Sequence, residues 1–135
     1  MRAVAVRIAL AVVAAALIGW LGAQLAEAWR LQEAADITFK PGPPPAGAQL
    51  RRADELLRSG GFAFDRRRRL TRALLLRRVG RPNAAIWILV GLTRDEPRDS
   101  DAWGFLLATA AASGHPALVA RAGAREADLV PPVPR

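Results

Sequence analysis

A few residues in this sequence have the chemistry for catalysis or metal binding, but their arrangement does not favour either. His115 is the only histidine and the chain has no cysteine, so no second imidazole or thiolate can complete a metal site. Ser59, Ser100 and Ser113 all fall at expected helix ends, where capping of backbone groups explains them. We therefore expect no enzyme, no metal and no cofactor.

A concentration of positive charge is the other feature of the sequence that could bind a ligand. Residues 51–81 contain eleven arginines against three acids, whereas residues 82–135 are nearly balanced. The basic patch is defined as Arg66, Arg67, Arg68, Arg69 and Arg72. Four successive residues point almost all the way around a helix, so they cannot all face one surface. A solvated helix start, anionic lipid headgroups, an acidic protein and a polyanionic envelope polymer remain the alternatives; nucleic acid is not expected beside an exported domain.

An uncharged, largely apolar stretch of 19 residues, 8–26, precedes all of these features. At about 1.5 Å per residue, a helix of this length nearly matches the ~30 Å hydrocarbon core of a bilayer. Trp20 and Trp29 lie toward one end of the stretch, where indole rings suit the boundary with the headgroups. We assign residues 1–28 to a transmembrane anchor that attaches the chain to the cell membrane.

The charges beside the anchor predict its orientation. Arg2 and Arg7 flank the short side, whereas the charges beyond the other end nearly cancel. The positive-inside rule then places the N-terminus in the cytoplasm and the rest of this single-pass protein outside. A cleavable secretory signal is the alternative, because Ala26 to Ala28 has the small-x-small form of a cleavage site. The stretch is longer than the usual signal core of about 7–15 residues, which favours an uncleaved signal anchor.

The rest of the chain reads as helical, with no convincing strand pattern, so the expected fold class is all-α. Residues 29–47 are expected to form a juxtamembrane helix followed by a proline-rich linker. A helical domain covers 48–131, and residues 132–135 are a C-terminal tail. Within the domain, the segment from Asn83 to about Arg94 is apolar nearly all round, which predicts a central helix. Asp65 is expected to cap an earlier helix.

Two equal intervals indicate an internal repeat. Gly80 and Gly114 are 34 residues apart, and so are Pro97 and Pro131. Each glycine ends the first helix of a pair, and each proline follows the second. A helix–turn–helix period of about 34 residues is the signature of the tetratricopeptide repeat.

The chain resembles the tetratricopeptide repeat (TPR) family over about residues 66–131, as a small membrane-anchored protein of bacterial type. Turn glycines, helix-packing residues and closing prolines carry the resemblance: Gly80, Ala85, Leu89, Leu92 and Pro97 in the first copy, and Trp103, Leu106, Gly114 and Pro131 in the second. Arg69 and Arg72 depart from it, since the family prefers Trp and Leu there. The resemblance implies a short array of about two and a half helical hairpins, in which 48–61 is the second helix of an earlier repeat whose opening helix is lost.

In this family the first helices of successive repeats line a concave groove. The positions that the resemblance assigns to a partner-binding groove are Arg67, Leu70, Leu74, Arg77 and Arg78 in the first repeat and Asp101, Gly104, Phe105, Ala108 and Ala112 in the second. Such a groove is basic at one end and apolar at the other. It suits an extended or helical segment with acidic and hydrophobic residues.

The expected function is therefore a membrane-anchored scaffold or adaptor that binds another protein of the cell envelope. One alternative is an accessory subunit of an envelope machine, held through its transmembrane helix. Another is a basic module that binds anionic lipid headgroups. A short array is marginal alone, so a second copy of the chain is a further candidate partner.

Overall fold

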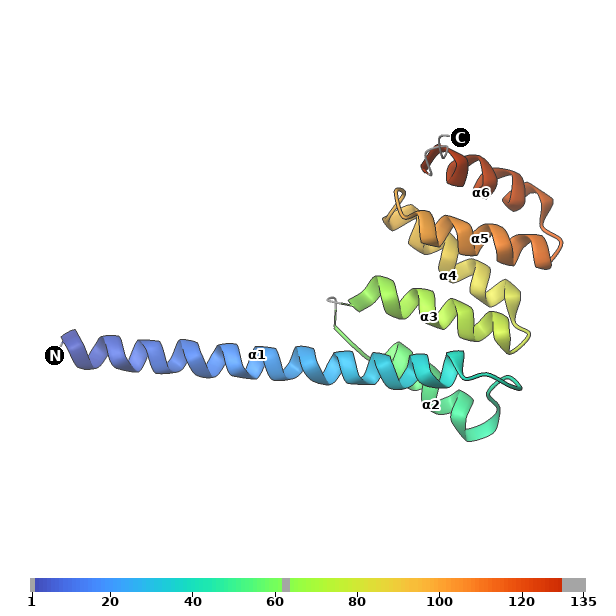
Figure 1. Cartoon of the computed structure of the whole chain (residues 1–135). Helices are drawn as coiled ribbons and strands as arrows, with labels where there is room; N and C mark the ends of the chain where they lie inside the picture. The colour runs from blue at the N-terminus through green and yellow to red at the C-terminus, as the bar shows by residue number, and fades with distance from the viewer. Residues whose placement is uncertain (1, 62–63, 130–135) are drawn as a thin grey trace, which may run out of the picture.

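Helices are the only regular elements in the described part of the chain (Figure 1). The computed structural model describes residues 2–61 and 64–129. The elements are α1 (Arg2–Phe39), α2 (Gly47–Arg58), α3 (Asp65–Arg78), α4 (Pro82–Asp95), α5 (Ser100–Ala112) and α6 (Pro116–Leu129). The prediction of an all-α chain with a long apolar N-terminal helix is confirmed. Pro131 and the predicted tail 132–135 lie outside the described residues.

The helices α3 to α6 lie side by side in a stack, and two of them, α3 and α5, are each followed by a glycine with the same backbone geometry. Gly80 has φ 75° and Gly114 has φ 71°, in the left-handed region that a residue with a Cβ enters only at a cost. The amide of the following residue, Arg81 or His115, donates to the carbonyl oxygen five positions earlier, at 2.8 Å and 3.0 Å. This is the Schellman arrangement. A proline then begins the next helix, α4 or α6, because its missing N–H needs no partner there.

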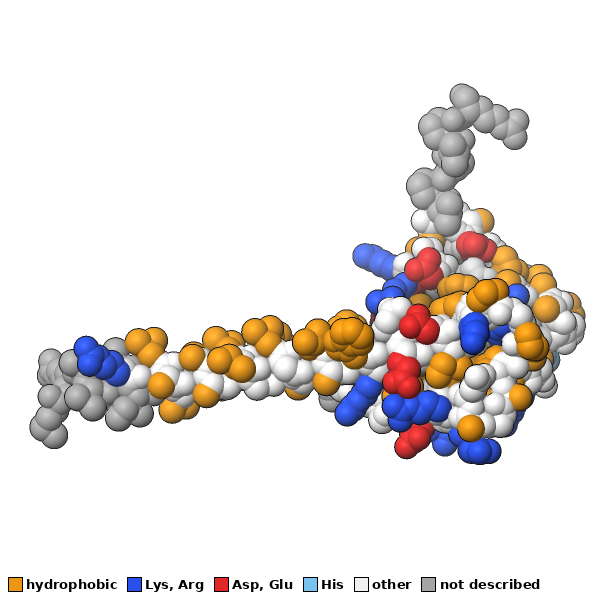
Figure 2. Space-filling model, turned by 60° about the horizontal axis from the view of Figure 1, so that its bottom comes forward, with side chains coloured by type: hydrophobic (Ala, Val, Ile, Leu, Met, Phe, Trp, Pro, Cys, Tyr) orange, Lys and Arg blue, Asp and Glu red, His pale blue; other side chains and the backbone are white. Residues whose placement is uncertain are grey.

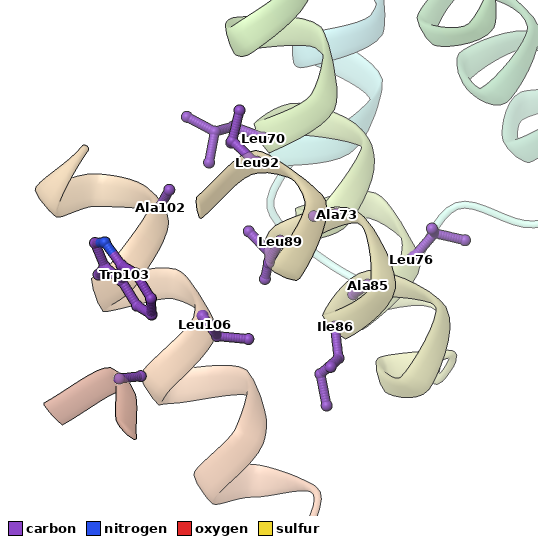
Figure 3. Close-up of a cluster of buried hydrophobic side chains, with 11 residues drawn as sticks. Leu70, Ala73, Leu76, Ala85, Ile86, Leu89, Leu92, Ala102, Trp103 and Leu106 are labelled. Atoms are coloured by element: carbon purple, nitrogen blue, oxygen red, sulfur yellow. The ribbon is translucent and has the colours of Figure 1, made fainter. Parts of the chain in front are cut away.

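The larger of two buried clusters joins α3, α4, α5 and α6 (Figure 3). Its members recur at helical spacing: Leu70, Ala73, Leu76, Ala85, Ile86, Leu89, Leu92, Ala102, Trp103, Leu106 and Ala122. Trp103 is buried, and its indole nitrogen donates to the carbonyl oxygen of Pro97 at 3.0 Å. This hydrogen bond ties the first turn of α5 to the α4–α5 connection.

The predicted central helix α4 lies between α3 and α5, but it is not covered on all sides. Ala85 and Leu89 are fully buried, but Trp87 is 78% exposed. The reason is that α4 packs against α3 and α5, which cover only two of its sides. A helix that is apolar all round therefore leaves one apolar face open.

The smaller buried cluster contains the end of α1. Leu31 and Ala34 of α1 pack with Ala53, Leu56 and Leu57 of α2 and with a leucine of α3. A hydrogen bond from Arg52 to Glu33 at 3.0 Å joins the two helices, which run in opposite directions. Residues 29–39 are thus part of the helical stack, and α2 has a first helix beside it. The idea of a lost opening helix before 48–61 is wrong, because the end of α1 takes that place.

The first two thirds of α1 project from the stack without covering by other helices (Figures 1 and 2). Leu10, Ile18 and Leu25 are all more than half exposed, and none of the side chains of residues 9–26 is buried. An 18-residue segment of this helix has a mean hydropathy of 2.0, and none of the segment is buried. Among the described residues, α1 is a helix long and apolar enough to cross a membrane.

Candidate functional site

Arg66 connects the start of α3 to the start of α5. Its guanidinium donates to both carboxylate oxygens of Asp99, at 2.6 Å and 2.7 Å, and to Asp101 at 2.9 Å. Asp99 also accepts the Ala102 amide at 3.2 Å, so Asp99 caps α5, and Ser100, which the sequence places at this helix end, is the first residue of the helix. The hydrogen bond from Arg66 is the main cause that holds the pKa of Asp99 below its ordinary value, while burial of the carboxylate acts in the opposite direction.

This lowered pKa gives a pH-dependent contribution to stability. The contribution is present above the ordinary aspartate pKa of about 3.9 and is lost as the pH falls through the lower folded-state value. Asp99→Asn keeps a capping side chain, and we expect it to reduce the free energy of unfolding at neutral pH by about 1 kcal/mol, since Arg66 is partly exposed and solvent screens the pair. Urea unfolding at neutral pH and at about pH 2 measures the difference. An equal deficit at both pH values would contradict the role of this pair.

Arg68 forms the most buried ion pair of the described residues. Its Nη1 lies 3.0 Å from Oε1 of Glu27, and the two side chains are 9% and 14% exposed. Nη2 donates to the carbonyl oxygen of Gly61 and to Asp65 at 3.2 Å. Asp65 is not the N-cap of α3, contrary to the prediction, because the helix begins at Asp65 and Phe64 holds the cap position; the Asp65 carboxylate pairs with arginines of the same helix. The pair joins α1 to α3 one residue beyond the apolar stretch 8–26.

The remaining arginines of the basic patch are also mostly paired. Arg69 lies 2.6 Å from Asp95 of α4, and Arg72 lies 3.1 Å from Asp54 of α2. Arg67 is exposed and forms no ion pair with any residue that the structure describes. Four of the five arginines therefore hold neighbouring helices together and do not form one open cationic surface.

Arg78, predicted to line the groove, instead binds the end of α1. Its guanidinium donates to the backbone carbonyl oxygens of Thr38, Lys40 and Gly42. Carbonyls at a helix C-terminus lack partners within the helix and carry partial negative charge, so a cation is favourable there. Arg78 and Arg68 thus fix α1 beside α3 at both ends of their contact.

Five predicted groove residues come together around a hollow of about 440 Å³. We call it the α3–α5 groove, and its lining residues are Arg77, Ser100, Asp101, Gly104, Phe105, Ala108 and Glu126. Arg77 is exposed at the end of α3, and Phe105 is half-buried on α5. An aromatic ring beside charges of both signs can hold a peptide through an apolar side chain and charged hydrogen bonds.

The other predicted groove positions lie elsewhere. Leu70 is buried in the larger core cluster, and Leu74 is half-buried on α3. Neither lines the α3–α5 groove, nor do Arg67 and Ala112. The repeat pattern assigned Leu70 to the groove, whereas this side chain packs in the larger core cluster with α4 and α5.

Glu126 is a groove residue that the sequence did not indicate. It lies on α6 and reaches over α5. A Cβ added to Gly104 would lie 3.1 Å from Oε1 of Glu126, so the glycine leaves room for this carboxylate. With Asp101 it adds negative charge to a groove that was predicted to be basic and apolar.

His115 takes part in a contact between helix ends. Its Nε2 lies 3.0 Å from Oδ1 of Asn83, which joins the α5–α6 turn to the start of α4. The residues that the structure describes contain no group of three or more side chains that could hold a metal ion.

No family model, no curated protein and no solved structure matches this chain. The relation to the tetratricopeptide repeat family stays a prediction from residue spacing.

Proposed function

We propose that this protein is a membrane-anchored scaffold or adaptor of the tetratricopeptide type. It binds a segment of another cell-envelope protein in the α3–α5 groove and holds that segment close to the membrane. The observation that carries the proposal is the groove itself, in which Arg77, Asp101, Phe105 and Glu126 gather from three helices. Aromatic and arginine side chains of this kind dominate the energy of protein interfaces.

The helix order supports a repeat array. α1 pairs with α2, α3 with α4 and α5 with α6, and α4 packs on α5 while α1 and α2 pack on α3. The equivalent turns at Gly80 and Gly114 share one hydrogen-bond pattern. With residues 29–39 as a first helix, the described residues form three hairpins, about the number that such arrays need for stability.

The exposed part of α1 supports attachment to a membrane. Apolar side chains such as Val12, Leu17 and Leu21 are more than half exposed, and lipid chains would remove them from water. Under the positive-inside rule, Arg2 and Arg7 place the N-terminus in the cytoplasm and the helical stack outside. The protein is then a single-pass membrane protein with its groove on the extracytoplasmic side.

The two alternatives draw less support. A headgroup-binding module needs free cations, but four of the five basic-patch arginines pair with carboxylates. A role for α1 as a contact with other membrane helices has no observation specific to it, because exposed apolar side chains suit lipid equally well.

A charge-reversed groove tests the proposal. We expect Arg77→Glu/Phe105→Ala in the full-length protein to reduce co-purification of the partner from native membranes roughly tenfold or more, since it removes an aromatic and an arginine contact. Arg121→Glu is the matched control, because Arg121 is exposed on α6 and does not line the groove. Circular dichroism checks that both variants fold. Undiminished co-purification with the groove variant would contradict the proposal.

A further inference from the structure

A second hollow, of about 470 Å³, lies between α2, α3 and α4. We call it the Trp87 groove. Its floor is apolar, with buried Leu75 and Leu76 and half-buried Val79 and Ile88. Trp87 stands at its side and is 78% exposed. None of its lining residues belongs to the α3–α5 groove, so the two surfaces are separate.

The charges around the Trp87 groove are strongly unequal. Four arginines and one aspartate line it, a surplus of three positive charges. The aspartate, Asp54, already pairs with Arg58 at 2.8 Å and with Arg72 at 3.1 Å. Arg51 and Arg81 are exposed and form no ion pair with any of the described residues. Unlike the basic patch, this groove therefore keeps cations available for a ligand.

The position of the groove excludes the anchoring bilayer as its ligand. The α3–α4 turn, which contains Arg81, lies at the end of the stack opposite the side from which the apolar part of α1 projects (Figure 1). The edge next to the projecting helix carries acidic and basic side chains side by side (Figure 2), among them the paired arginines at the start of α3. A membrane crossed by α1 would face this edge, where the charges pair with each other, whereas Arg81, which forms no ion pair with the described residues, lies at the far end of the stack.

We propose that the Trp87 groove binds an acidic amphipathic helix of a partner protein. Apolar side chains of the helix pack on Ile88 and the ring of Trp87, and acidic side chains on its flanks pair with Arg51 and Arg81. An apolar floor with charged sides is the form that helix-binding grooves take. Trp and Arg are the residue types most often found at the energetic centres of interfaces.

This binding goes beyond the proposed function, because it gives the stack a second surface. An adaptor with two separate grooves can hold two segments at once, one in each groove. If both segments belong to one partner, the second contact becomes intramolecular and strengthens the whole complex.

Site-specific photo-crosslinking in native membranes tests the inference. The full-length protein carries Trp87→p-benzoylphenylalanine, and mass spectrometry identifies the residues joined to it. We expect a discrete protein adduct whose crosslinked segment has net negative charge and apolar residues at helical spacing. Adding Arg51→Glu/Arg81→Glu should reduce the adduct roughly tenfold or more, because like charges then face each other.

Two controls make each outcome decisive. Arg121→Glu/Arg125→Glu makes the same change of charge on α6, where both arginines are exposed, and should leave the adduct unchanged. Arg51→Gln/Arg81→Gln should give an intermediate loss, and circular dichroism shows that each variant folds. The inference is overturned by adducts with lipid only, with a second copy of this chain, with a basic segment or with nothing, and by an adduct that survives the charge reversal.

Discussion

A chain that begins at Ala48, and so lacks α1, is expected to lose the cooperative unfolding of α2 and α3. A chain that begins at Gln24 keeps the buried end of α1 and is expected to retain cooperative unfolding. The shorter chain lacks Leu31 and Ala34, which cover Leu56 and Leu57 of α2 in the smaller buried cluster. Leu75 of α3, fully buried in the full chain, is uncovered as well. The proline-rich segment looks like a domain boundary in the sequence, but the packing of α1 crosses it.

The size of this effect follows from the buried area. A fully buried leucine side chain contributes about 1.5–3 kcal/mol to the free energy of unfolding. Removal of α1 uncovers Leu56, Leu57 and Leu75 only in part, because α2 and α3 still cover one another, so the three together should lose roughly 4 kcal/mol. Small domains have a total stability of about 5–15 kcal/mol, so this loss is large. Thermal unfolding followed by circular dichroism, with hydrogen exchange to locate protection in α2, compares the two chains. Equal melting temperatures and equal protection of α2 would show that α1 does not belong to the stack.

Glu27→Gln is expected to lower the free energy of unfolding by about 2 kcal/mol. The substitution leaves the guanidinium of Arg68 buried without its main partner, a change that costs about 3–5 kcal/mol at fully buried pairs. The cost is smaller here because Asp65 remains 3.2 Å from the same guanidinium. For a domain of this size the melting temperature should fall by roughly 10 °C.

Two further variants separate this pair from a general effect of charge. Glu33→Gln removes a similar carboxylate from the same helix, but its pair with Arg52 is about half exposed and should change stability by less than about 1 kcal/mol. Glu27→Leu/Arg68→Met removes both charges and should recover much of the loss, since an apolar pair can replace a buried ion pair. If Glu27→Gln and Glu33→Gln have the same small effect, Arg68 does not depend on Glu27.

The helices could be predicted from the sequence because residues at their own ends determine where they begin and end. Gly80 and Gly114 end α3 and α5 near the expected positions, and Pro82 and Pro116 begin the helices that follow. Glycine and proline act on their own backbone, so sequence alone carries the information. Asp99 is similar, since its cap on α5 involves an amide three residues away.

The second role of α1 was missed although a signal was present. Leu31, Ala34 and Thr38 recur at intervals of three and four residues, and all three are buried. This apolar stripe follows a longer apolar stretch directly, so it was read as an extension of the anchor. A buried stripe can be told from the end of a membrane helix only when the helix that covers it is known. Here that helix is α2, which lies beyond the proline-rich segment and so looked like part of a separate domain.

The partners of the arginines could not be predicted from spacing. Arg66 pairs with Asp99 and Arg68 with Glu27, across 33 and 41 residues. Such contacts depend on which helices become neighbours and on their register, whereas sequence rules describe pairs three or four residues apart. The basic patch therefore looked like one charged surface, and the structure distributes four of its arginines over contacts with four helices, α1, α2, α4 and α5.

The most direct test is a distance measurement between α1 and the far side of the stack in a lipid bilayer. The chain has no cysteine, so Arg30→Cys and Ala111→Cys place spin labels only at these two exposed positions on α1 and α5. If the membrane helix continues as the first helix of the array, double electron–electron resonance will show one narrow distance distribution. A broad distribution, as expected for a domain on a flexible tether, would contradict the fixed placement of the groove beside the membrane.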